Sequence, residues 1–328
     1  MNSFGTIFRV SLWGESHGAQ IGVCMDGVPA GIALTESDFE ADIDRRRAGA
    51  RGTTPRREAD VPHIVSGLFE GCTTGAPLTV LFYNENTRSS DYHDLRRIPR
   101  PSHADFTAAA KFGGRNDYRG GGHFSGRVTL ALVAAGVVAK RILGDGVRFT
   151  TEVTEIGGTT DKAEFEKVVA VAAAVGDSVG GIIECRADGV EVGLGEPFFD
   201  SAESLAAHLL FSVPAVKGVE FGSGFAGSRL RGSQNNDPIV DSCGTTATNN
   251  AGGINGGITN GNQLVVRAAV KPTPTISCPQ QTYDFGEGHT AEIAMHGRHD
   301  TCIALRAGVV IEAAVAIALA DLKLRAGR

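Results

Sequence analysis

Apolar stretches of helical length alternate with shorter β-like runs along this chain of 328 residues. Residues 128–143 are apolar almost throughout, and their number favours a buried helix over a strand. Residues 308–324 repeat this pattern and predict a closing helix. Further helices are expected at residues 36–47, 162–175 and 201–211. Strands are expected at residues 4–13, 20–25, 64–69, 77–83, 149–155, 180–187, 218–222 and 263–270.

Two polar, glycine-rich segments interrupt these elements at residues 84–127 and 223–262. Irregular segments of such length inside a compact domain are usually functional. No linker divides the chain, and no solenoid-type repeat occurs. Buried apolar helices need sheet on more than one side. We therefore predict an α+β fold with a single domain over residues 1–328.

Composition limits the kinds of binding partner and the cellular compartment that are expected for this chain. The net charge is -6, which argues against a nucleic-acid-coating surface, and no apolar run is long enough to cross a bilayer. The N-terminus carries no signal-peptide pattern. We expect a cytoplasmic protein with reduced thiols, no metal site and no nucleic-acid or membrane partner. The cysteines form no CxxC pair; they are Cys24, Cys72, Cys185, Cys243, Cys278 and Cys302.

Histidine occurs in two segments suited to proton transfer. Glycines on both sides expose Ser16 and His17 on a tight turn, although a capped turn with a surface histidine would look the same. That turn also fits GxSxG, but the residues after it do not predict the helix of a nucleophile elbow. In RPSHAD, Arg100 favours a neutral His103 and Asp105 favours its charged form. The segment is a tuned general acid or a hydrogen-bonded loop.

Arginines concentrate in one short region of this acidic chain. Their planar fork suits phosphate and carboxylate, and so many neighbouring charges repel one another unless anions lie between them. A solvated face with acidic partners is the alternative. The cluster consists of Arg45, Arg46, Arg47, Arg51, Arg56 and Arg57.

Three further segments could hold an anion or a flat ligand. Residues 117–127 bring three consecutive glycines to a helix start, which favours an anion site over a plain hinge. Residues 249–261 let the backbone pass close to a ring, or are turn glycines. Residues 271–275 offer one cation and two hydroxyls, and residues 297–300 add an arginine and an aspartate; a loop cap and a surface ion pair are the alternatives.

Together these motifs resemble the chorismate synthase family over nearly the whole chain. The motifs in order are GESHG, DRRR, RPSHAD, DYRGGG, VKGVEFG, AGGINGGITNG, KPTPTI and GRHD. The resemblance implies helices sandwiched between antiparallel sheets, a homotetramer and reduced FMN as cofactor. It implies 5-enolpyruvylshikimate 3-phosphate as substrate, which loses phosphate and a ring proton by 1,4-anti-elimination without net redox change.

The resemblance also implies residue roles. His17 would protonate the leaving phosphate, His103 would be an acid toward reduced flavin, and Asp300 would assist proton acceptance. Ser16 and Ser125 would support these transfers. The implied substrate-binding residues are Arg46, Arg51, Arg100 and Arg127. The implied FMN-binding residues are His123, Phe124, Ser125, Pro214, Ala215, Gly256, Lys271, Pro272, Thr273, Pro274, Thr275 and Arg298.

The chain departs from the family pattern at two positions. The family commonly has Arg where His123 follows the triple glycine, so a phosphate contact there would be weaker or pH-dependent. The family often has Gly where Ser102 precedes His103, which reduces backbone freedom beside that histidine.

The two alternative functions are FMN binding without catalysis and NAD(P)H-dependent flavin reduction. A protein that only binds FMN would need neither two histidines nor substrate arginines. An NAD(P)H-dependent flavin reductase would need a dinucleotide site, and no GxGxxG loop occurs. We therefore expect an external reductase to supply the reducing equivalents, with direct reduction by NADPH as the alternative.

Overall fold

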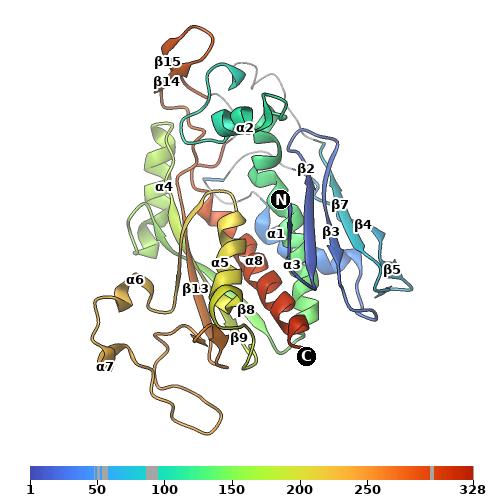
Figure 1. Cartoon of the computed structure of the whole chain (residues 1–328). Helices are drawn as coiled ribbons and strands as arrows, with labels where there is room; N and C mark the ends of the chain where they lie inside the picture. The colour runs from blue at the N-terminus through green and yellow to red at the C-terminus, as the bar shows by residue number, and fades with distance from the viewer. Residues whose placement is uncertain (48, 50–51, 54–57, 86–94, 296–298, 328) are drawn as a thin grey trace.

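The computed structural model describes residues 1–47, 49, 52–53, 58–85, 95–295 and 299–327. Long helices lie between two antiparallel sheets, which stand on opposite sides of the helix layer (Figure 1). The first sheet has the order β1-β2-β3-β7-β4, and its strands are Ser3–Phe4, Arg9–Gly14, Gln20–Asp26, Leu78–Tyr83 and His63–Ser66. The second has the order β10-β13-β9-β8, and its strands are Val216–Phe221, Leu264–Val270, Gly181–Asp188 and Arg148–Ile156.

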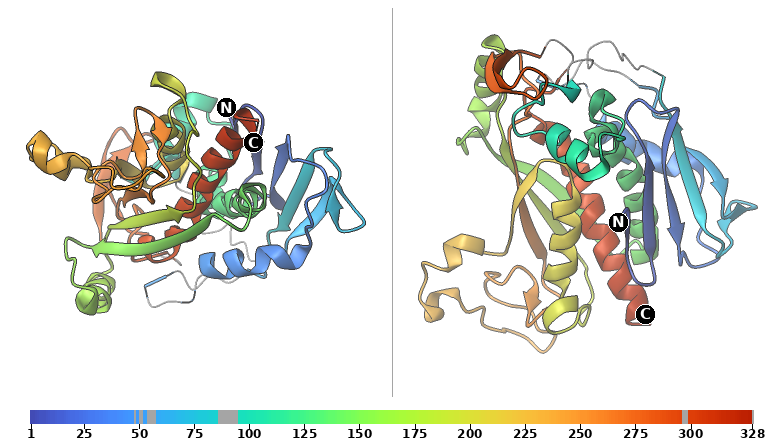
Figure 2. Two further views of the ribbon diagram at one scale, coloured as in Figure 1. Left: turned by 90° about the horizontal axis from the view of Figure 1, so that it is seen from below. Right: turned by 45° about the horizontal axis from the view of Figure 1, so that its top comes forward.

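Two apolar helices form the middle of this sandwich. α3 (Thr129–Leu143) packs on the first sheet, α8 (Ala304–Arg325) packs on β8 and β9, and the two helices pack against each other (Figure 2). Both are buried on nearly every face, as expected for helices that are apolar all round. A Cβ at Gly136 would overlap Ala313, so the glycine permits the close approach of α3 and α8.

Two more helices complete the middle layer. α1 (Glu40–Arg46) follows a 3-10 turn at Glu36–Phe39, whose start carries the Thr35–Asp38 capping box, and α5 (Ala202–Ser212) packs on α8 and β10. One hydrophobic core cluster includes residues of both sheets and of the helices. This core confirms the α+β prediction and supports the single domain, which stays a prediction.

The remaining elements are short or lie outside the sandwich. α4 (Phe165–Ala174) covers β8, and the β14–β15 hairpin projects beyond the helix ends (Figure 1). Within the described residues, no helix is long and apolar enough to cross a membrane. All six cysteines are free thiols. The other elements are α2 (Asp105–Phe112), α6 (Gly224–Gly227), α7 (Gly232–Asn235), β5 (Leu68–Phe69), β6 (Cys72–Thr73), β11 (Ile254–Asn255), β12 (Ile258–Thr259), β14 (Gln280–Asp284) and β15 (His289–Ile293).

The structure corrects several of the expected elements: residues 4–13 form two strands, β1 and β2, and the segment 223–262 contains α6, α7, β11 and β12. The segment 84–127 is not irregular throughout, because it contains α2 and 3-10 turns at Arg119–Phe124 and Gly126–Val128. α8 begins four residues before the expected 308. The β14–β15 hairpin was missed, because its polar residues lack the alternating pattern of a half-buried strand.

Candidate functional site

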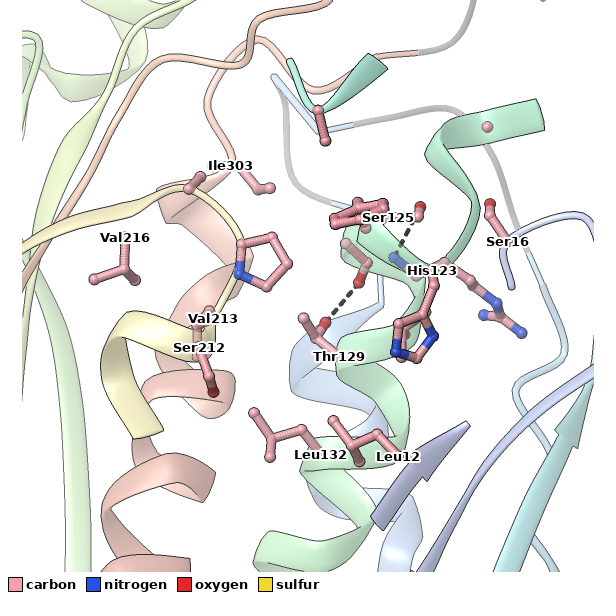
Figure 3. A pocket seen from close by; sticks show the side chains of 18 of the residues that line it. Leu12, Ser16, His123, Ser125, Thr129, Leu132, Ser212, Val213, Val216 and Ile303 are labelled. Carbon is pink, nitrogen blue, oxygen red and sulfur yellow. Dashed lines mark hydrogen bonds between the residues drawn. The ribbon is translucent and has the colours of Figure 1, made fainter. Parts of the chain in front are cut away.

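A cavity of about 950 Å³ opens where α3 and α8 begin. Leu12 and Leu132 form one side of it, and Val213 and Val216 face them across the space (Figure 3). The described lining includes three acidic residues, Glu58, Asp60 and Asp300. It includes seven basic ones, Arg46, Arg47, Arg100, Arg127, Lys217, Lys271 and Arg306. The excess of positive charge over an apolar wall suits a ligand that is both anionic and partly flat.

The triple glycine lies against both predicted acid histidines. A Cβ at Gly120 would overlap the ring of His17, and a Cβ at Gly121 would come within 3.3 Å of the ring of His103. Both glycines have positive φ, which other residues rarely adopt. The glycine run therefore serves a purpose that its sequence did not reveal: its backbone packs directly on the two imidazoles.

The GESHG turn leaves β2 at this point. Ser16 is 1% exposed, and its amide donates to the carbonyl of Gly122 at 3.0 Å. Nδ1 of the His123 ring lies 2.7 Å from the carbonyl oxygen of Gly14. A carbonyl only accepts, so Nδ1 carries the hydrogen. These contacts hold the GESHG turn against the glycine run, so that both lie at the same cavity.

His103 occupies the opposite part of the glycine run. Its Nδ1 lies 2.7 Å from Oδ1 of Asp105, and Arg100 pairs with the same carboxylate at 2.7 Å. Burial lowers the pKa of His103; the hydrogen bond to Asp105 opposes this effect, and the charge of Arg100 adds to it. Arg100 is 5% exposed, and its third nitrogen donates to Oγ1 of Thr275 at 3.1 Å.

Arg46 is buried at the floor of the cavity. Its Nε donates to Oγ1 of Thr129 at 3.1 Å, and Nη2 donates to the carbonyl of Gly126 at 2.7 Å. Burial and the charge of Arg306 lower the pKa of Arg46 to about 9, although Asp60 raises it. A guanidinium stays protonated at neutral pH, so the lowered pKa expresses an electrostatic strain that a bound anion would relieve.

Two other arginines share this floor. Arg127 is 8% exposed, pairs with Asp60 and donates from Nε to Asn84 at 3.0 Å. Arg306 donates from Nη2 to Asp300 at 2.7 Å. Its buried Nε has no hydrogen-bond partner among the described residues. Arg306 is thus the cation with an uncommitted donor, and the sequence analysis missed it because it stands at the start of an apolar helix.

The segment 271–275 forms a further part of the lining. Lys271 donates from Nζ to the carbonyl of Ser102 at 2.5 Å, and burial together with Lys217 lowers its pKa. Ser102 has a φ of 60°, the left-handed region that glycine prefers. The buried Oγ1 of Thr273 has no hydrogen-bond partner among the described residues, so this hydroxyl can take a ligand.

Most of the predicted site residues meet at this one cavity. Those that line it are Ser16, His17, Arg46, Arg100, His103, His123, Phe124, Ser125, Arg127, Pro214, Ala215, Lys271, Thr273, Pro274, Thr275 and Asp300. Pro272 does not line it, and Gly256 lies in the β11–β12 turn, also outside the lining. Arg51 and Arg298 lie outside the described residues.

Comparisons with known proteins agree with the motif series. The family model described as chorismate synthase matches residues 8–324. A chorismate synthase of Chitinophaga pinensis is 58% identical over 324 residues, covering 99% of this chain and 97% of the relative. One from Methanosarcina mazei is 46% identical and covers 99% and 97%. A crystal structure of a chorismate synthase has 27% identity and a TM-score of 0.76, covering 98% of this chain and 93% of the other.

Proposed function

Because the chain belongs to the chorismate synthase family and is therefore a lyase, we propose that its cavity binds 5-enolpyruvylshikimate 3-phosphate beside reduced FMN. The reaction would be the 1,4-anti-elimination of phosphate to give chorismate. The observation that carries this proposal is the described lining, in which seven Lys or Arg residues face three acidic ones. Two carboxylates and a phosphate on the substrate would supply the missing negative charge.

The cavity fits a flavin phosphate by the chemistry of its donors. Lys271, the unpartnered hydroxyl of Thr273 and Thr275 would hold the phosphate tail, and the wall of Leu12, Leu132 and Val213 would receive the ring. His123, Phe124, Ser125, Pro214, Ala215 and Pro274 line the same space. When bound, reduced flavin supplies transient electron donation to the substrate.

The chain's own residues would then hold and move protons. His17 would protonate the leaving phosphate, with Ser16 and Gly120 fixing the turn that presents it. His103 would hold a proton toward the flavin side of the cavity. Asp300, paired with Arg306, would assist proton acceptance. Ser125 would support these transfers and caps the 3-10 turn by accepting from the amide of Arg127 at 3.2 Å.

The substrate anions would meet Arg46 and Arg306 first, because burial and the charge of Arg306 lower the pKa of Arg46, and the buried Nε of Arg306 has no hydrogen-bond partner among the described residues. Arg127 and Arg100 would contribute at longer range, since their donors face Asp60, Asp105 and other acceptors. The roles of Arg51 and Arg298 rest on the family motif.

The deciding experiment is anaerobic turnover. Purified protein is mixed with dithionite-reduced FMN and 5-enolpyruvylshikimate 3-phosphate, and chorismate absorbance is followed together with phosphate release. Both products should appear, and only with reduced flavin. Tight FMN binding without product would favour a flavin-binding protein instead.

We further propose an external reductase, a homotetramer and a cytoplasmic location. Reduction of FMN by NADPH in the purified protein under anaerobic conditions would contradict the first and favour direct reduction. A sizing column with light scattering tests the second, and fractionation of cells tests the third.

A further inference from the structure

Asp105, the first residue of α2, is a buried carboxylate with an unusually full set of donors. It is 8% exposed and does not line the main cavity. Its Oδ2 accepts from the amide of Arg100 at 3.1 Å and from Nε at 2.8 Å. Its Oδ1 accepts from Nη2 of Arg100 at 2.7 Å and lies 2.7 Å from Nδ1 of His103. One carboxylate therefore holds an arginine and a cavity histidine together.

The geometry determines which histidine nitrogen carries the hydrogen. Nδ1 of His103 lies 3.1 Å from Nη2 of Arg100 but only 2.7 Å from Oδ1 of Asp105, so the carboxylate is the nearer partner, and an unprotonated Nδ1 would set its lone pair against that oxygen. An ionised carboxylate only accepts. Hydrogen bonds from Arg100 and His103 lower the pKa of Asp105, although burial opposes them. Nδ1–H must therefore point at Asp105, which leaves Nε2 as the nitrogen that exchanges a proton.

The other side of the ring is fixed by backbone. A Cβ at Gly121 would come within 3.4 Å of Nε2 of His103, so the absence of a side chain at this glycine keeps space beside that nitrogen, and His103 itself lines the cavity. Arg100 reaches on to Thr275 at 3.1 Å, which ties the pair to the segment 271–275. The groups facing the imidazole are thus Asp105, Arg100 and, through its charge, Lys271. Only Asp105 among them favours the charged ring.

We propose that Asp105 is a positioning residue that fixes His103 as the Nδ1–H tautomer and aims Nε2 into the cavity. The proposal rests on the proposed function for its catalytic consequence, since His103 would act as the acid there. This role goes beyond an ion pair with Arg100, because such a pair would not require contact between Asp105 and His103. In serine proteases an aspartate orients its histidine in the same sense.

The first test uses the wild-type chain with ¹⁵N-labelled histidine. The nitrogen shifts of His103, assigned by comparison with His103→Gln, should show Nδ1 protonated and Nε2 unprotonated above the pKa of the ring. An Nε2–H tautomer would overturn the proposal. This measurement does not depend on turnover, so it separates failure of the positioning role from failure of the proposed function.

The second test compares Asp105→Asn with Asp105→Glu. In the Asn variant kcat should fall about 10²–10⁴-fold, the range that a positioned general acid contributes, while KM changes little. The limb of the pH profile on which activity falls with rising pH should move to lower pH, because the contact that raises the pKa of His103 is gone. Asp105→Glu, which restores a carboxylate, should recover part of kcat and of the limb.

Asp284→Asn is the matched control. Asp284 is 2% exposed, pairs with Arg97 at 3.2 Å and accepts from backbone amides, but no cavity histidine touches it. This variant should alter thermal stability and leave the pH profile in place. If Asp105→Asn behaves like Asp284→Asn, with kcat and the pH limb unchanged, Asp105 is only a structural partner of Arg100 and the proposal fails.

Discussion

Neighbouring residues Arg45 and Arg46 belong to two different charge clusters, the first partly exposed and the second buried. Arg45 points into the helix layer, where Nη2 meets Glu312 at 2.6 Å and Lys140 pairs with the same carboxylate. We call this the helix cluster; its members are Arg45, Lys140, Asp42 and Glu312. Arg46 points into the cavity. The cavity cluster consists of Arg46, Arg127, Arg306, Asp60 and Asp300.

Electrostatic balance separates the two clusters. The helix cluster pairs two cations with two carboxylates, and the hydrogen bond to Glu312 raises the pKa of Arg45. The cavity cluster has three arginines for two aspartates, and burial lowers the pKa of Arg46 to about 9. A balanced cluster is complete in the folded chain, whereas an unbalanced one is completed by an anion. The balance of charge therefore distinguishes structural charges from binding charges in these two clusters.

Glu312→Gln should have the largest effect on stability. Glu312 is 2% exposed, and its loss leaves Asp42 alone to pair with the two cations between α1, α3 and α8. We expect the free energy of unfolding to fall by about 2–4 kcal/mol, below the fully buried range because Arg45 is partly exposed. Urea unfolding followed by circular dichroism measures this. Glu164→Gln, which breaks an exposed pair with Lys167, should change stability by less than about 0.5 kcal/mol.

Arg306→Met should affect binding rather than folding. Losing a charged donor to a substrate anion is expected to raise KM about 10–100-fold, because such contacts contribute about 1.5–3 kcal/mol. The melting temperature should change little, because relief of the repulsion among three arginines offsets the loss of the ion pair with Asp300. Calorimetric titration with substrate in the presence of oxidised FMN gives Kd directly. Equal Kd values for Arg306→Met and wild type would show that the charge excess does not bind the anion.

Arg45→Met is the matched variant in the helix cluster and is measured by the same calorimetric titration. It removes a cation from the balanced cluster, so stability should fall while Kd for the substrate stays near the wild-type value. A weakened Kd here would erase the distinction between the two clusters.

Acid should weaken the helix cluster. Burial raises the pKa of Glu312, but its bonds to Arg45 and Lys140 prevail and hold the pKa below the usual 4.5. The stability from this group is therefore present above its unfolded pKa and is lost as pH falls through the lower folded pKa. The gap in melting temperature between wild type and Glu312→Gln should narrow below about pH 4. A constant gap would place the stabilisation elsewhere.

The smallest expected effect concerns backbone strain beside the cavity. Ser102 holds a φ of 60° while its carbonyl accepts from Lys271. Ser102→Gly removes the backbone strain of the folded state but raises the conformational entropy of the unfolded chain. The two effects nearly cancel, so the free energy of unfolding should change by less than about 1 kcal/mol. Thermal melts measure the change. Ser102→Ala, which keeps the strain, is the comparison, and a loss above 1 kcal/mol in the glycine variant would show that strain is not what this serine contributes.

The sequence predicted elements with strong periodicity better than side-chain directions. α3 and β13 (Leu264–Val270) follow the apolar patterns closely, because burial on both sides or on alternate sides leaves a clear record. Most of the residues that the motifs predicted as site residues also line one cavity. The residue pattern alone did not separate Arg45 from Arg46, since a run of like residues does not say which side chain finds a partner; the family resemblance did, because it implied Arg46 and not Arg45. Arg306 escaped for the same reason, because one charge within an apolar helix resembles a surface position.

The sequence also did not show which residues from distant parts of the chain pack together. The two histidines and the triple glycine are recognisable separately, but that Gly120 lies on His17 and Gly121 on His103 depends on three loops meeting. The fold supplies that meeting, and local propensity does not encode it.

The start of α3 and of α8 at one cavity has a consequence beyond the residues that line it. The peptide dipoles of a helix add up to roughly half a positive charge at its N-terminus. Thr129 and Ile303 place both helix starts on the cavity wall. The backbone itself therefore contributes an attractive field for anions, and it would persist if any single arginine were replaced. Substitution of side chains can adjust the affinity of this cavity, but its preference for negative charge is built into the direction in which its two central helices run.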